Sequence, residues 1–166
     1  MRFVRRFLRA LSLVGTLVAL TGCLSSALQH LPLEDQAQLT LYKKVMTPAQ
    51  VRTYLAKGSA AERTAYLQAS GLVQRFEALA PLDRDAVRNG FPRVGMSAEA
   101  LRFVWGDPYE TAGDATRYAH WRYLGSSLDL TAYGNQYRKS GNRVDVSLID
   151  GHIVGWVDYI PRGAGR

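Results

Sequence analysis

The side chains of this 166-residue chain that could do chemistry are few and do not cluster. Its three histidines, His30, His120 and His152, have no metal-ligand spacing. Ser126 and Ser127 lie outside any Gly-x-Ser-x-Gly turn, and no base is placed near them. The aspartates form no calcium-loop pattern, and no glycine-rich phosphate loop is present. We therefore predict a protein that is not an enzyme and that binds no metal and no dissociable cofactor.

The only cysteine, Cys23, has a more specific setting. It closes the run Leu20-Thr21-Gly22-Cys23, in which two small residues let a peptidase approach the backbone. An uncharged apolar stretch, residues 10–20, precedes this run, and four arginines precede the stretch, as in an export signal. The pattern resembles a bacterial lipoprotein signal peptide, residues 1–22, with its lipobox. The resemblance implies that Cys23 becomes the N-terminus and carries a diacylglycerol and an N-acyl chain such as palmitate.

Two other interpretations of this N-terminus are an ordinary secretory signal and an uncleaved membrane anchor. The uncharged run continues to Leu33, but its polar residues and Pro32 make the second half a poor membrane span. All three interpretations place the remaining chain outside the cytoplasm. Leu24 follows the cysteine where aspartate would favour the inner membrane. We therefore expect a lipid-anchored envelope protein at the outer membrane, facing the periplasm, and the inner membrane stays an alternative.

The length and the charge of the chain limit the classes of protein to which it can belong. Removal of residues 1–22 would leave 166 − 22 = 144 residues, enough for one domain with a substantial core. The four arginines of the signal would leave with it, so the formal charge would fall to +7 − 4 = +3. This mild excess does not predict a nucleic-acid binder, and it favours at most a weak attraction to anionic headgroups. With its one thiol acylated, the chain must fold by packing alone.

The first part of the mature chain contains a tether and then a helical region. Residues 23–46, beginning with the lipidated cysteine, carry few structural signals, although the apolar residues within 39–45 could order. Thr47-Pro48-Ala49-Gln50 and Ser59-Ala60-Ala61-Glu62 both have the spacing of a helix-capping box. Glycine and proline interrupt the apolar stripes that follow. We predict three or four short helices over residues 47–90, which must pack on each other or on later elements.

The second part is expected to form one helix and a small sheet. Ser97 caps a helix that Gly106 ends, and the apolar period then changes from helical to two. The dipeptide Asp150-Gly151 is a strong signal for a two-residue hairpin turn. Expected strands are residues 117–124, 143–149 and 152–159, with 128–133 as a further short strand in an otherwise loop-like segment, residues 125–142.

The hairpin turn also predicts a register. Val144, Val146 and Leu148 should lie opposite Val157, Gly155 and Ile153 on an apolar face, and Arg143 should lie opposite Asp158 on a mixed face. The fold class is therefore α+β, with four or five short helices packed on one face of a small antiparallel sheet of three or four strands.

Residues 94–159 carry a family resemblance. Gly95-Met96-Ser97, then Trp105-Gly106-Asp107-Pro108, an aromatic strand and the closing hairpin resemble the SmpA/OmlA (BamE-like) family of outer-membrane lipoproteins. The resemblance implies a helix-plus-antiparallel-sheet domain over residues 91–161, which is also similar to β-lactamase-inhibitor-like domains that bind proteins. Residues 47–90 lie ahead of the matching segment, and 162–166 are expected to form a flexible tail.

The segment around residues 133–143 is the candidate contact surface. Tyrosines and cations alternate there, and such residues are favoured at interfaces, although a solvated connection is the simpler interpretation. The candidate interaction residues are Tyr133, Tyr137, Arg138, Lys139, Arg143 and Trp156. We predict a membrane-anchored, non-enzymatic module that binds or scaffolds an envelope protein, with a possible role in outer-membrane assembly or maintenance. A periplasmic ligand-sensing or inhibitor domain is the first alternative, and a cell-wall or lipid-modifying enzyme is the second.

Overall fold

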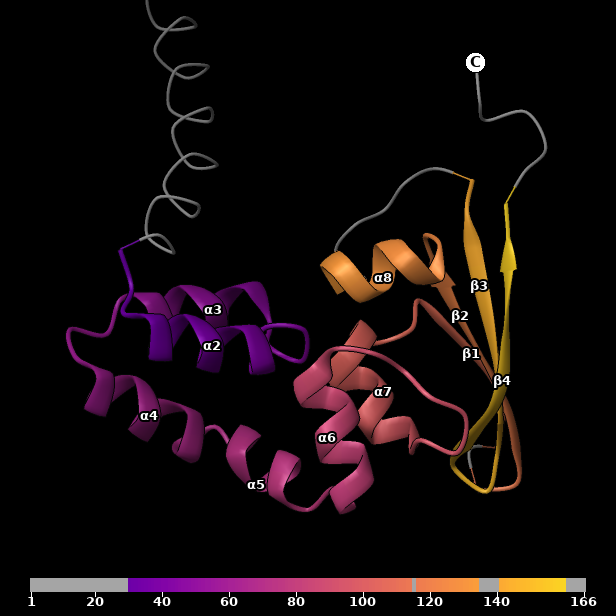
Figure 1. Ribbon diagram of the computed structural model, residues 1–166, viewed down its shortest axis with the longest axis horizontal. Coiled ribbons are helices and arrows are strands. Elements are labelled where there is room, and N and C mark those ends of the chain that lie inside the picture. Colours follow the sequence, from indigo (N-terminus) through magenta and orange to yellow (C-terminus); the bar gives the residue numbers. More distant parts are fainter. Residues whose placement is uncertain (1–29, 115, 135–140, 161–166) are drawn as a thin grey trace, which may run out of the picture. The chain divides into compact units, whose positions relative to one another are not determined.

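The computed structural model describes residues 30–160, except 115 and 135–140. Cys23, the lipobox residues Leu20, Thr21 and Gly22, and the candidates Tyr137, Arg138 and Lys139 therefore lie outside the described residues. The chain divides into two compact units, Met1–Gln38 and Leu39–Arg166. The described residues form seven helices and one four-stranded antiparallel sheet, which confirms the α+β class with more helices than we predicted (Figure 1).

The expected tether is helical in its second half. Helix α2 (Leu33–Tyr42) crosses the boundary between the two units. In the first unit, the side chain of Gln36 donates to the carbonyl of Leu31 at 2.8 Å. In the second unit, Tyr42 and Met46 are buried. The chain up to Met46 therefore includes part of the core, and the apolar residues within 39–45 were the part of the expected tether that could order.

Four short helices follow, as predicted, and both capping boxes are present. The side chain of Thr47 accepts from Gln50 N, while Gln50 accepts from Thr47 N, and Ser59 and Glu62 make the same reciprocal pair. Each box satisfies two backbone donors that a helix start leaves free. The four helices are α3 (Pro48–Leu55), α4 (Ala60–Ala69), α5 (Leu72–Glu77) and α6 (Pro81–Asn89).

Helix α7 (Ala98–Trp105) is the element on which the helical region packs. Five of its eight residues are buried, so it is covered on most of its circumference. The ring of Phe103 lies 6.0 Å from that of Phe76 in α5. The buried carboxylate of Asp83 in α6 accepts from Ser97 N at 3.0 Å, next to the start of α7. Residues 47–90 thus belong to the same compact unit as the sheet and reach it through α7 (Figure 1).

The sheet has the order β1-β2-β3-β4, with each strand antiparallel to its neighbours. Trp105 of α7 packs on one face of it, with ring centroids 5.4 Å from Tyr123 and 5.9 Å from Trp156. This face is called the covered face. The strands are β1 (Glu110–Asp114), β2 (Tyr118–Leu124), β3 (Arg143–Ile149) and β4 (His152–Tyr159).

The segment Gly95-Met96-Ser97 covers the beginning of the β4 edge. Gly95 N donates to the carbonyl of Ile153 at 2.7 Å, and Ile153 N donates to the carbonyl of Met96 at 2.8 Å. Gly95 has φ +80°, which a side chain would disfavour. The motif that carries the family resemblance therefore joins the entrance of α7 to the hairpin.

The register of the hairpin is only partly as predicted. Leu148 pairs with Ile153, but the register shifts between Ser147 and Leu148, so that Val144 pairs with Asp158 and Arg143 with Tyr159. The expected Arg143–Asp158 pair is therefore wrong. The physical reason is a β-bulge, because β4 carries one extra residue at Val154 and a bulge shifts all later pairs.

The segment expected as a short strand at 128–133 is also wrong, because it forms helix α8 (Ser127–Tyr133). Ser126 and Asp129 make a capping box at its start, and Ser127 N and Oγ both donate to Asp158 of β4 at 2.7 Å. At the other end, Lys44 Nζ donates to the carbonyl of Val104 in α7 at 2.6 Å and to that of Thr131 in α8 at 2.8 Å. Burial lowers the pKa of Lys44 to about 8, with a smaller contribution from neighbouring Lys43.

Candidate functional site

None of the helices that the structure describes lies on the second face of the sheet (Figure 1). Along β2 and β3 buried residues alternate with accessible ones, and the accessible residues lie on this side. We call this side the open face. By register its residues are Glu110, Ala112, Asp114, Tyr118, His120, Arg122, Leu124, Arg143, Asp145, Ser147, Ile149, His152, Gly155, Val157 and Tyr159.

The bulge in β4 decides which residues reach the open face. Beyond it, Trp156 and Asp158 turn to the covered face, where Trp156 packs on Trp105 and Asp158 binds α8. Val157 and Tyr159 turn to the open face instead, with 55% and 46% of their surfaces exposed. Without the bulge, the open face would present a tryptophan and an aspartate in their place.

A chain of ion pairs runs across three strands of the open face. Arg122 Nη1 lies 2.8 Å from Glu110 Oε2, and Arg122 Nε lies 3.0 Å from Asp145 Oδ1. Arg143 Nε lies 3.2 Å from the same Asp145 oxygen. The hydrogen bond to Asp145 is the main reason that the pKa of Arg122 is raised. Two cations and two anions make the network neutral overall, so a partner that covers it meets no net charge.

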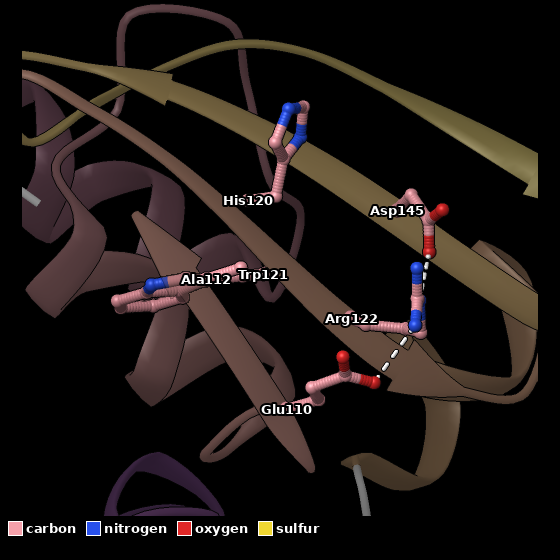
Figure 2. A pocket seen from close by; sticks show the side chains of 6 residues that line it. All are labelled: Glu110, Ala112, His120, Trp121, Arg122 and Asp145. Carbon is pink, nitrogen blue, oxygen red and sulfur yellow. Dashed lines mark hydrogen bonds and ion pairs between the residues drawn. The ribbon is translucent and has the colours of Figure 1, made fainter. Parts of the chain in front are cut away.

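The open face is hollowed beside this network, as Figure 2 shows. The depression has a volume of about 250 Å³, and Arg122 lies between the two carboxylates, Glu110 and Asp145, on its rim. The lining residues, which come from β1, β2 and β3, are Glu110, Ala112, His120, Trp121, Arg122 and Asp145.

The pairing of residues between the strands explains why the open face is hollowed at this point. Ala112, His120, Ser147 and Gly155 are paired in one row across all four strands, and three of the four have small side chains. The next row holds the ion pairs, and the row on the other side includes Tyr118 and Ile149. Long side chains on both sides of a row of small ones leave a trough that protruding side chains of a partner can enter.

Apolar and aromatic groups surround the trough. Tyr118, Ile149, Val157 and Tyr159 are all exposed. The ring of Tyr118 lies edge-on to His120 at 4.7 Å, and Arg143 stacks over Tyr159 at 4.4 Å. Aromatic residues and arginine are enriched in protein interfaces relative to the rest of a protein surface. The open face therefore contains residue types that are enriched in protein interfaces.

Among the described residues, the histidines form no ion pair with a carboxylate. His120 Nδ1 lies 3.4 Å from Ser147 Oγ, and His152 Nδ1 lies 2.8 Å from the carbonyl of Asp150. In the part of the chain that the structure describes, no three metal-capable side chains cluster. The arrangement offers hydrogen-bonding and stacking groups, and no nucleophile is held against a base and an orienting acid.

Two of the three described candidate residues from the sequence are separated from the open face. Tyr133 ends α8, where it is exposed, and Trp156 lies partly buried against Trp105. Arg143 does belong to the open face. Glu110, Arg122 and Asp145 were not predicted from the sequence, because their grouping depends on which strands are neighbours. The alternation of apolar and charged residues in 118–124 and 143–149 was the available signal.

Comparison of the chain with protein-family models, with curated proteins and with solved structures gives no match. Among residues 30–160, apart from the gaps given above, no helix combines the length and the apolar character that crossing a membrane requires.

Proposed function

We propose that this protein is a lipid-anchored envelope lipoprotein of the SmpA/OmlA (BamE-like) kind, which binds another envelope protein through the open face. The proposal that this protein binds a partner is supported by the difference between the two faces of the sheet. One is buried under α7 and α8, and the other presents a trough, a neutral ion-pair network and exposed aromatic rings. Covering a neutral network costs less desolvation energy than covering an unpaired charge.

The anchor part rests on the sequence around Cys23 and on its similarity to a lipobox. Three acyl chains would hold the chain end in a membrane essentially permanently, because each buried CH₂ contributes about 0.8 kcal/mol. Residues 24–32 separate Cys23 from α2. An extended chain spans at most about 3.5 Å per residue, so Leu33 would stay within roughly 35 Å of the lipid surface. The partner would therefore be a protein of that membrane or one held close to it.

Fractionation of cells tests the anchor. Wild-type protein should remain in the membrane pellet after a carbonate wash, while the Cys23→Ser protein should move to the soluble envelope fraction. A Cys23→Ser protein that matures normally and stays in the washed pellet would contradict the anchor.

Co-purification from detergent-solubilised membranes tests the binding face. Val157→Lys places a charge in the open face opposite Asp145, its cross-strand neighbour, so the fold should tolerate it. Leu82→Lys is a matched control, because Leu82 is 67% exposed in α6. A protein recovered in fixed ratio with the wild type and with Leu82→Lys should be lost with Val157→Lys. Equal recovery with both variants would reject the open face as the binding surface.

A further inference from the structure

A second hollow lies at the end of the sheet where β2 ends, β3 begins and β4 ends. Its volume is about 500 Å³, twice that of the depression in the open face. Gly125 N donates to the carbonyl of Asn142 at 2.8 Å, which holds the ends of β2 and β3 together there. The described lining residues are Leu124, Gly141, Asn142, Arg143, Asp158, Tyr159 and Ile160.

Arg143 is the cation in this lining, and its position is fixed from two directions. Its guanidinium stacks on the ring of Tyr159 at 4.4 Å, and its Nε lies 3.2 Å from Asp145 Oδ1. Among the described residues, no hydrogen bond reaches its two terminal nitrogens. A stacked guanidinium with free terminal nitrogens is a planar fork, which matches a carboxylate in two parallel hydrogen bonds.

The acid in the lining, Asp158, already has partners. Its two oxygens accept from Ser127 N and Ser127 Oγ, each at 2.7 Å, at the N-terminus of α8 where a negative charge is favoured. Asp158 therefore does not occupy Arg143. The rim adds apolar surface, since Ile160 is 63% exposed. The hollow thus combines one positioned cation with the apolar side chains of Leu124 and Ile160 and the ring of Tyr159.

We propose that this hollow binds a carboxylate of the partner protein, either an acidic side chain or a chain end, through Arg143. The proposal rests on the proposed function in taking the ligand to be a protein group. A carboxylate fits better than a phosphate headgroup, because Asp158 in the same lining repels a doubly charged anion more strongly than a singly charged one. The planar fork of Arg143 can donate to both oxygens of a carboxylate in two parallel hydrogen bonds.

Titration by nuclear magnetic resonance, with the full chain in a neutral detergent, tests this proposal. The probes are N-acetylglycine, which carries a carboxylate, its neutral amide, and inorganic phosphate. N-acetylglycine should shift the amides of Gly141, Asn142 and Tyr159 and the Nε–H of Arg143 in a saturable way, whereas the neutral amide should not. Arg143→Gln should weaken this binding at least tenfold, because it removes a charge-assisted pair.

Arg88→Gln is the matched control, because Arg88 also stacks on a ring, at 5.3 Å from Phe76, and also pairs with an aspartate, at 3.2 Å from Asp85. It should bind N-acetylglycine as the wild type does. Three results would overturn the proposal: wild-type affinity in a folded Arg143→Gln protein, equal shifts with the neutral amide, or tighter binding of phosphate than of the carboxylate. If the carboxylate fails while Val157→Lys still loses its partner, only the assignment of this hollow is rejected.

Discussion

The two faces of the sheet are made by alternate residues of the same strands, yet they have opposite properties. On the covered face, Tyr123 and Val146 are buried and pack toward α7. On the open face, Arg122 and Asp145 form ion pairs that solvent reaches. Packing of the covered face contributes more to stability than the open face does, because buried apolar area is the main favourable term in folding. The open face is then free to be shaped by contact with a partner.

The largest loss of stability is expected from a substitution on the covered face. Trp105 is fully buried between Tyr123 and Trp156, and its Nε1 donates to Thr131 at 3.0 Å. Trp105→Ala should lower the free energy of unfolding by about 3–5 kcal/mol, because it leaves a large cavity. Urea denaturation followed by circular dichroism measures this. A loss below about 1 kcal/mol would show that α7 does not hold the covered face.

The second prediction concerns the contact between the two helices that cover the sheet. Lys44→Met removes the ammonium that bridges the carbonyls of Val104 and Thr131, so both carbonyls lose a partner. We expect a loss of about 1–3 kcal/mol in the free energy of unfolding. Lys43→Met is the matched control, since the Lys43 ammonium makes no hydrogen bond or ion pair with the described residues, and its backbone N–H, which donates to Leu39, is unchanged by the substitution. Similar unfolding midpoints for the two variants would contradict a structural role for Lys44.

The third prediction is a pH dependence of stability. Burial lowers the pKa of Lys44 to about 8, from an ordinary value of 10.5 that the unfolded chain should show. Between these values the unfolded state binds more protons than the folded state, so the free energy of unfolding should rise with pH. Because Lys44 is partly exposed, solvent reduces the size of this rise. Lys44→Met should lack this contribution, so the difference in unfolding free energy between the wild type and Lys44→Met should rise from pH 8 to pH 10. A difference that falls over this range would contradict the sign.

The smallest expected change in stability is on the open face. Val157→Lys should alter the free energy of unfolding by no more than about 0.5 kcal/mol, because surface substitutions away from caps and buried groups have small effects. Urea denaturation of the Val157→Lys and Trp105→Ala proteins under the same conditions compares the two faces directly. A loss of several kcal/mol from Val157→Lys would mean that the open face also carries the fold.

The sequence predicted local structure where the cause is local. The capping boxes at Thr47 and Ser59, the stop at Gly90 and the turn at Asp150-Gly151 depend on neighbouring residues, and all are present. The strand β1 (Glu110–Asp114) was not predicted, because Glu-Thr-Ala-Gly-Asp contains few residues that favour strands. Residues 128–133 form a helix because Ser126 and Asp129 cap it, a signal that the sequence analysis overlooked.

The candidate site was less predictable, because its geometry depends on non-local pairing. Composition indicated Arg143 as a contact residue, and the structure places it on the open face. Composition gave no means to join Arg143 to Glu110, since that requires knowing that β1, β2 and β3 are neighbours. The position of Trp156 depends on one extra residue in β4, and a shift of one residue moves a side chain to the other face.

Site-specific photo-crosslinking in intact membranes tests the central claim most directly. A photoreactive amino acid replaces either Val157 on the open face or Leu82 on α6, both of which are exposed. Irradiation should yield a discrete protein adduct from position 157 and none from position 82. No protein adduct from position 157, or the same adducts from both positions, would contradict the assignment of the open face as the surface that binds a partner.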